Sequence, residues 1–261
     1  GRTDYVLDDE GLIMKRLIVR CDDFGLTQGC SLGILRTLEN GCISSVGSIV
    51  NTGLRGDDAR VLSGYAGVSV GLHVNVVAGK PLSDPRLVRG LVDCDGCFYA
   101  SRRYRCSDTD LIDPIELERE ATAQVERFKE LFCKLPAYID CHSVATPHVD
   151  EALTKVAEKY GVPYVDIDLT YLKDTCNVYA PKLPNNMDYD SYDPLQFLMS
   201  DDAGILTHES TFVVFHPAFL DQDLMEISSL REGRIKDQAA LSSLQFKTWL
   251  AEHGICLMPI V

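Results

Sequence analysis

The chain has 261 residues, long enough for one large α/β domain or two small ones, and its 46% hydrophobic and 25% charged residues are ordinary for a soluble globular protein. Its 39 acidic and 25 basic residues give a net charge of -14, which argues against nucleic acid or an anionic membrane surface as a partner and favours a neutral or cationic ligand. No apolar run approaches the roughly 20 residues that span a bilayer. The polar N-terminus also lacks the hydrophobic centre of a signal peptide, so we expect a cytoplasmic protein.

The first predicted element is preceded by a polar, acidic segment, residues 1–13, which ends just before Met14-Lys15. We interpret it as an expression remnant or a disordered extension and expect one domain over 14–261. Residues 16–26 then read R-L-I-V-R-C-D-D-F-G-L. An apolar run that ends in two carboxylates and a glycine is typical of a buried parallel strand that opens into a functional loop.

Asp22 and Asp23 lie next to each other in this segment, and in a regular strand their side chains would point to opposite faces. Both can serve one site only if the backbone turns there, and Gly25 supplies the freedom for that turn. If Asp22 faces the interior, Arg20 lies on the same face and can pair with it. The alternative is that Asp23 caps the next helix while Asp22 is solvated.

The rest of the chain alternates between strand and helix patterns, with no linker that divides it. Because alternation of this kind indicates a parallel sheet, about seven strands favour a closed or nearly closed TIM-barrel-like (β/α) barrel over a doubly wound open sheet. The first strand is followed by a helix that Thr27 caps, with Leu32, Leu35 and Leu38 on one face and its end at Asn40-Gly41. The other expected strands are 43–50, 68–77, 137–142, 163–169, 211–216 and 255–261, and the other expected helices are 57–63, 114–132, 149–160 and 238–253, the last with Leu241, Leu244 and Leu250 inward. Residues 78–113 and 171–207 are expected to be long irregular insertions.

Ten cysteines are scattered through the chain, several inside apolar segments, which indicates buried, reduced thiols. Cys94 and Cys97 form the only close pair, with Cys106 nearby. Because no second pair follows to complete a tetrahedral set, we do not expect a structural metal there. The role of the pair stays open.

Polar residues that suit metal or acid–base chemistry follow four of the predicted strands: Asp22 with Asp23, His73, His142 and His216. The C-terminal ends of barrel strands meet at one mouth, where sites are built. Any one of these histidines is more often a core or loop residue, but their joint position predicts a shared site. One carboxylate and two imidazoles, from Asp23, His73 and His142, leave coordination positions open for water and substrate.

Asp140 lies two residues before His142, on the same face of the strand, where it can orient an imidazole that binds metal. A solvated or capping carboxylate is the alternative. The ligand set accepts Zn, Mg, Mn, Co or Fe(II), so it does not identify the ion.

Four segments carry a resemblance to a known family. They are Cys21-Asp22-Asp23-Phe24-Gly25, Gly71-Leu72-His73-Val74-Asn75 with Gly79-Lys80-Pro81-Leu82, Ile139-Asp140-Cys141-His142, and His216-Pro217-Ala218-Phe219-Leu220-Asp221. In this order the sequence resembles the YdjC-like (ChbG-type) carbohydrate deacetylases.

The resemblance implies a metal-dependent hydrolase with a TIM-barrel-like fold that removes acetyl groups from N-acetylated sugars of the chitooligosaccharide type. It implies that Asp22 is the general base, that Asp23, His73 and His142 bind one divalent ion, with Mg or Zn expected, and that His216 is the general acid. No partner is expected besides the sugar and, in a homodimer, a second copy of the chain.

The sequence departs from the family pattern at three points. Ser143 and Thr146 stand in a segment where the family often has clustered histidines, Arg20-Cys21 replaces a common Asn-Ala, and Ala218 replaces a glycine. Two other functions therefore stay open. One is metal-dependent hydrolysis of a phosphoester or of an amide outside sugars, and the other is a non-catalytic sugar-binding barrel.

Overall fold

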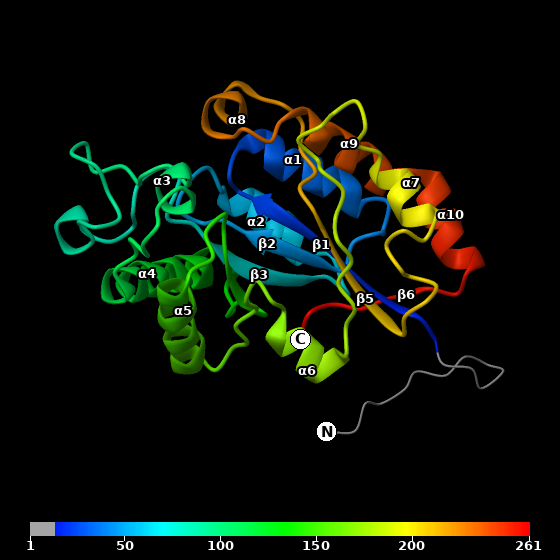
Figure 1. The fold of residues 1–261 in the computed structure, drawn as a ribbon, viewed down its shortest axis with the longest axis horizontal. Helices are drawn as coiled ribbons and strands as arrows, with labels where there is room; N and C mark the ends of the chain where they lie inside the picture. Colours follow the sequence, from blue (N-terminus) through cyan, green and yellow to red (C-terminus); the bar gives the residue numbers. More distant parts are fainter. Residues whose placement is uncertain (1–13) are drawn as a thin grey trace.

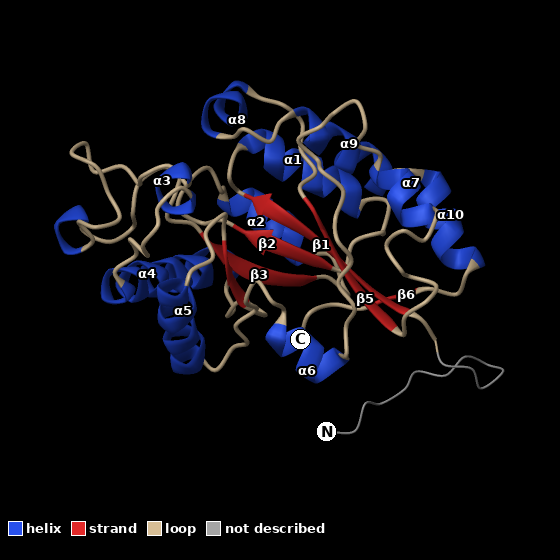
Figure 2. Cartoon of the chain, in the orientation of Figure 1, coloured by secondary structure: helices blue, strands red, loops and turns tan. Residues whose placement is uncertain are grey.

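The computed structural model describes residues 14–261, so the interpretation of residues 1–13 lies outside the described part. The chain forms one α/β domain in which a central parallel sheet is surrounded by helices (Figures 1 and 2). The strands are β1 (Arg16–Phe24), β2 (Ser45–Ser48), β3 (Ser69–Val74), β4 (Ile139–Cys141), β5 (Ser210–Phe215) and β6 (Cys256–Leu257). The helices are α1 (Gln28–Leu38), α2 (Gly56–Ser63), α3 (Arg102–Arg105), α4 (Pro114–Phe132), α5 (Pro147–Tyr160), α6 (Thr170–Cys176), α7 (Pro194–Met199), α8 (Gln222–Ile227), α9 (Glu232–Leu241) and α10 (Leu244–Glu252), with a 3₁₀ turn at Pro85–Leu87.

All the strand pairings are parallel, as the alternating pattern predicted, in the order β4-β3-β2-β1-β5, and β6 pairs with the start of β1. Isolated bridges continue the sheet beyond both edges, from Ile139 to Tyr164 and from Thr211 to Tyr179. These bridges take the place of a regular seventh strand, so the predicted strand 163–169 is wrong. The chain turns there because Asp166 accepts hydrogen bonds from the backbone N–H groups of Leu169 and Thr170, which leads into α6.

Alternate residues of β1 lie on two different faces of the sheet. Leu17 and Val19 belong to the main apolar cluster, together with residues of α1, α4 and α5, whereas Ile18 belongs to a second cluster with Tyr138 and Phe212. We call these the outer and the inner face. Because side chains alternate along a strand, Arg20 and Asp22 follow Ile18 onto the inner face. The outer residues are Leu17, Val19, Cys21, Val46, Val70, Leu72, Val74, Ile139, Val213 and Phe215; the inner residues are Ile18, Arg20, Asp22, Ser45, Gly47, Gly71, His73, Tyr138, Asp140, Phe212 and Val214.

Two glycines on the inner face make room for large or charged neighbours. A Cβ atom at Gly47 would lie 2.5 Å from Oδ1 of Asp22, and one at Gly71 would lie 2.3 Å from the ring of Tyr138. Both separations are far shorter than a van der Waals contact. The small residues of β2 and β3 therefore leave the space in which the polar side chains of the inner face collect.

Four of the five predicted helices are present as single elements. Thr27 accepts a hydrogen bond from the N–H of Cys30 and caps α1, and α4 spans the predicted residues. The predicted helix 238–253 is wrong as one element, because Ser243 accepts a hydrogen bond from the N–H of Phe246 and starts α10 as a separate helix. Leu244, which was expected to face inward, is 72% exposed, and Leu32, expected on one face with Leu35 and Leu38, is 46% exposed.

The two predicted insertions contain only short helices, α3 in the first and α6 and α7 in the second. Within residues 14–261, no helix is both long enough and apolar enough to cross a bilayer.

Candidate active site

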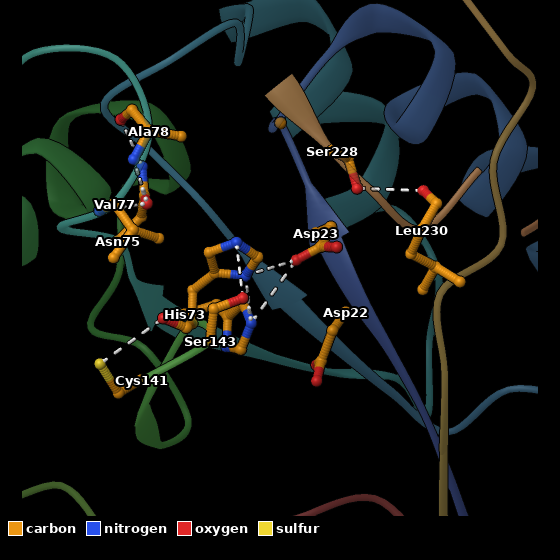
Figure 3. Close-up of polar contacts among 12 residues, drawn as sticks. Asp22, Asp23, His73, Asn75, Val77, Ala78, Cys141, Ser143, Ser228 and Leu230 are labelled. Carbon is orange, nitrogen blue, oxygen red and sulfur yellow. Dashed lines mark hydrogen bonds and ion pairs between the residues drawn. The ribbon is translucent and has the colours of Figure 1, made fainter. Parts of the chain in front are cut away.

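The backbone turns at the end of β1, as the paired aspartates require. Asp23 has a φ of 77°, in the left-handed region, and the register with β2 shifts between Cys21 and Phe24. Gly25 follows at φ 92°, and a Cβ atom there would lie 2.3 Å from the carbonyl oxygen of Ile49. Because of this turn, Asp22 and Asp23 each have a carboxylate oxygen within 4.8 Å of a ring nitrogen of His73, although their side chains point in different directions (Figure 3). The alternative role of Asp23, as the cap of the next helix, does not hold, because Thr27 is the cap of α1.

Three of the predicted metal ligands converge at this turn. Nδ1 of His142 lies 2.9 Å from Oδ1 of Asp23, and Nε2 of His73 lies 3.6 Å from the same oxygen. The two imidazole nitrogens are 3.2 Å apart. One carboxylate oxygen and two ring nitrogens, from three separate strand ends, thus lie close enough to share one ion.

Asp140 orients His73 rather than His142, the residue that follows on its own strand. Oδ1 of Asp140 lies 2.9 Å from Nδ1 of His73, an arrangement that leaves Nε2 facing Asp23. A carboxylate behind an imidazole in this way is the usual support of a histidine that binds metal. Burial disfavours the charge on His73, but Asp140, Asp22 and Asp23 outweigh it and raise the pKa of His73 to about 9 in the absence of an ion.

Arg20 links the two carboxylates of the inner face. Its guanidinium group donates to Oδ2 of Asp22 at 2.8 Å and lies 3.1 Å from Oδ2 of Asp140. The expected pairing of Arg20 with Asp22 is therefore present, and both side chains are almost fully buried.

A second group of side chains, Asp22, His73 and Asp140, is also compact enough to hold an ion. Arg20 already supplies positive charge to both carboxylates of that group, so a divalent ion would meet electrostatic repulsion there. In the first group, Oδ1 of Asp23 is buried and has no donor in hydrogen-bond geometry. That unpaired acceptor and the two facing imidazoles suit a divalent ion, so the residues present fit the metal that the sequence implies.

Sequence reasoning missed two charged residues of α9. The guanidinium of Arg234 donates to Oδ2 of Asp23 at 2.7 Å, and Oδ2 of Asp237 accepts from the backbone N–H of His216 at 2.9 Å. Although burial opposes the change, His142 and Arg234 hold the pKa of Asp23 well below its usual range. Arg234 and Asp237 are three residues apart, which places both on one helix face, and this spacing is the signal in the sequence that could have found them.

His216 follows β5 and lines the same cavity as Asp23 and His142. This cavity has a volume of about 320 Å³. Burial is the main cause that lowers the pKa of His216 to about 4, with Arg234 and His73 adding to it and Asp23 and Asp22 opposing it. The imidazole is therefore neutral at neutral pH. The cavity, which we call the mouth, is also lined by Arg105, Ser143, Ser228 and Arg234.

The other three histidines lie outside this site. Nδ1 of His148 lies 2.6 Å from the carbonyl oxygen of Ile112, His208 stacks on Tyr179, and Nδ1 of His253 lies 2.8 Å from the carbonyl oxygen of Trp249. The pair Cys94 and Cys97 belongs to no cluster within residues 14–261 that could hold an ion, and both thiols are free.

Comparisons with known proteins show the family of the chain. The sequence pattern of the YdjC-like protein family matches residues 16–252. A carbohydrate deacetylase of Thermoanaerobacter pseudethanolicus is 30% identical over 94% of this chain and 97% of its own length. A carbohydrate deacetylase of Listeria monocytogenes is 29% identical over 92% of this chain and 96% of its own.

Among solved structures, the fold is similar to that of a protein from Enterococcus faecalis V583 described as a cellobiose-phosphate cleavage protein. The TM-score is 0.77 at 23% identity, over 95% of this chain and 98% of that one. The family pattern matches nearly the whole domain, and the relatives align with this chain over almost their full length. The chain therefore belongs to the YdjC-like protein family.

Proposed function

We propose that this protein is a metal-dependent carbohydrate N-deacetylase that hydrolyses the acetamide of an N-acetylated amino sugar of the chitooligosaccharide type. The observation that carries the proposal is the convergence of Asp23, His73 and His142 beside the buried carboxylate of Asp22. The two curated relatives named carbohydrate deacetylases support the same reaction.

In this proposal Asp23, His73 and His142 would hold one divalent ion, Mg or Zn. When bound, such an ion lowers the pKa of a water molecule and polarises a carbonyl group. Asp140 fixes the ring of His73, while Arg234 fixes the carboxylate of Asp23.

Asp22 is the proposed general base, because one of its oxygens is held by Arg20 and the other, Oδ1, is buried without a donor. It takes a proton from the attacking water as the water oxygen bonds to the acetyl carbon. His216 is the proposed general acid, which protonates the sugar nitrogen as the C–N bond breaks. Since its pKa is lowered to about 4, His216 is neutral in the resting protein, so the proton that it gives to the sugar nitrogen is the one that Asp22 removed from the water and passes on before the C–N bond breaks.

The test is acetate release from N-acetylglucosamine oligomers, measured with and without a chelator beside a panel of phosphoesters. We expect acetate release that stops with the chelator and returns when a divalent ion is restored, with no phosphate release. Phosphate release without acetate would favour the phosphoesterase alternative. Sugar binding without any turnover that depends on metal would favour the non-catalytic barrel.

A further inference from the structure

A second cavity adjoins the mouth, and no step of the proposed reaction uses it. It has a volume of about 490 Å³, within the usual range for small-molecule sites. We call it the chamber. Most of its lining side chains are apolar, and they come mainly from β5, from the segment after β4 and from residues 163–169 and 171–207. They include Val144, Ala145, Val165, Ile167, Leu183 and Phe212.

The chamber and the mouth share a wall. Arg105 and Ser143 line both cavities, and the side chain of Arg105 donates to the carbonyl oxygen of Ser143 at 3.1 Å. Cys141 lines the chamber and the next residue, His142, lines the mouth. A molecule whose reacting group lies at His142 can therefore extend into the chamber past Cys141.

Two features indicate that the chamber receives a ligand. Ile167 lines it and is 73% exposed, so a large apolar side chain stands uncovered on its wall. Arg20 also lines it, is only 8% exposed, and its Nε has no hydrogen-bond acceptor. Buried donors of this kind are nearly always paired in proteins, so an acceptor atom of a ligand is expected there.

We propose that the protein also accepts N-acetyl amino sugars that are linked to an apolar aglycone, an aryl or alkyl group that carries a hydrogen-bond acceptor, and that the chamber binds this aglycone while the N-acetyl sugar lies in the mouth. The inference rests on the proposed function, because it places the sugar at Asp23 and His142. An oligosaccharide in the chamber is disfavoured, because most of the lining side chains are apolar, and two of the polar ones, Arg20 and Asp140, already pair with each other at 3.1 Å.

The experiment compares the 4-nitrophenyl and methyl glycosides of N-acetylglucosamine by calorimetry. The aryl group adds an apolar body with acceptor oxygens, whereas the methyl group does not reach the chamber. We expect the wild-type protein to bind the aryl glycoside at least about tenfold more tightly, since burial of an aromatic ring contributes well over that factor. Equal affinity for the two, or no binding of the aryl glycoside, would overturn the assignment.

Two variants locate the effect. Ile167→Asp makes the chamber wall polar, and Ala145→Trp fills the chamber; both residues are exposed, so neither change disturbs the core. We expect the preference for the aryl glycoside to fall to threefold or less in each, with the affinity for the methyl glycoside unchanged. The matched control is Ile115→Asp on α4, where the isoleucine is 65% exposed and outside the chamber, and where the preference should stay. A preference unchanged in both chamber variants would place the aryl group elsewhere.

Acetate release from the same two glycosides separates this inference from the proposed function. If no acetate is released but the aryl preference depends on Ile167, the deacetylase proposal fails and the chamber assignment holds. If acetate is released from both glycosides with the same KM, the deacetylase proposal holds and the chamber assignment fails.

Discussion

On the outer face of the sheet, Leu17, Val19 and Leu72 are fully buried in one apolar cluster with the helices, whereas on the inner face their neighbours Arg20 and His73 form ion pairs and hydrogen bonds. Successive residues of each strand point alternately to one face and to the other. A shift of the strand register by a single residue would exchange them. Stability and chemistry are thus encoded in alternate residues of the same strands, and substitutions on the two faces should have separable effects.

The largest expected effect is on catalysis, from the inner face. We expect Asp22→Asn to lower kcat for acetate release by about a hundredfold to ten-thousandfold, the usual contribution of a general base. Metal content should stay at the wild-type level, because Asp23, His73 and His142 are intact. The control is Asp57→Asn, an exposed carboxylate at the start of α2. Unchanged turnover, or a loss of metal, in Asp22→Asn would contradict the separation of base and ligands.

The next effect concerns the stability of the inner face itself. Arg20→Met leaves the buried carboxylates of Asp22 and Asp140 without their cation, and loss of one partner from a buried ion pair costs about 3–5 kcal/mol. Urea denaturation measures the change in the free energy of unfolding. Arg36→Met removes a pair with Glu39 that is more than half exposed, so it should change stability by less than about 0.5 kcal/mol. Similar values for the two variants would show that the inner network adds little.

The outer face should show the reverse pattern. Leu72→Ala lies next to His73 in sequence but removes only buried apolar contact, which costs about 2–5 kcal/mol of stability. The kcat of the folded variant, measured well below its denaturation midpoint, should remain within about twofold of wild type. Leu244→Ala, at a position 72% exposed, is the matched control and should be nearly neutral. A large loss of kcat in Leu72→Ala would mean that the two faces are not separable.

The smallest expected effect is a pH dependence of the free energy of unfolding, which comes from Asp237 of α9. Burial raises the pKa of Asp237 to about 6, although Tyr192, the backbone N–H of His216 and Arg234 oppose this rise. Between pH 4 and 6 the folded protein holds a proton that the unfolded chain has released, so this group stabilises the fold below about pH 4 and the contribution is lost as the pH rises through 6.

In Asp237→Asn we therefore expect the free energy of unfolding to fall less between pH 4 and 7 than in the wild type, by about 1–3 kcal/mol. Thermal or urea denaturation at several pH values measures the difference. Asp223→Asn, an exposed acid in α8, should leave the wild-type dependence unchanged. Parallel pH profiles for wild type and Asp237→Asn would contradict the raised pKa.

The outer face is also the part that the sequence predicts best, since apolar periodicity reports burial against helices. The failures lie where local hydrogen bonds outweigh that periodicity. Asp166 turns the backbone where a strand was expected, and Ser243 divides a helix whose apolar pattern looks continuous. Leu32 fits a helical stripe but lies at its exposed edge, because the stripe is centred on Cys30 and Ile34.

In the candidate site, residues at strand ends could be predicted because parallel strands bring their ends together. Arg234 and Asp237 reach Asp23 and His216 from a helix beyond β5, so no strand end marks them, and their spacing of three residues on one helix face is the signal that the sequence offers. The sequence could not say which histidine Asp140 supports. Asp140 lies only two residues before His142, but the parallel register of β3 and β4 places it directly beside His73.

The central claim is that Asp23, His73 and His142 hold one divalent ion. Anomalous diffraction from crystals of the wild-type protein soaked in Mn²⁺ tests it most directly. The account predicts a single strong peak bound by these three side chains. A peak bound by Asp22 and Asp140 instead, or no peak at either group, would contradict it.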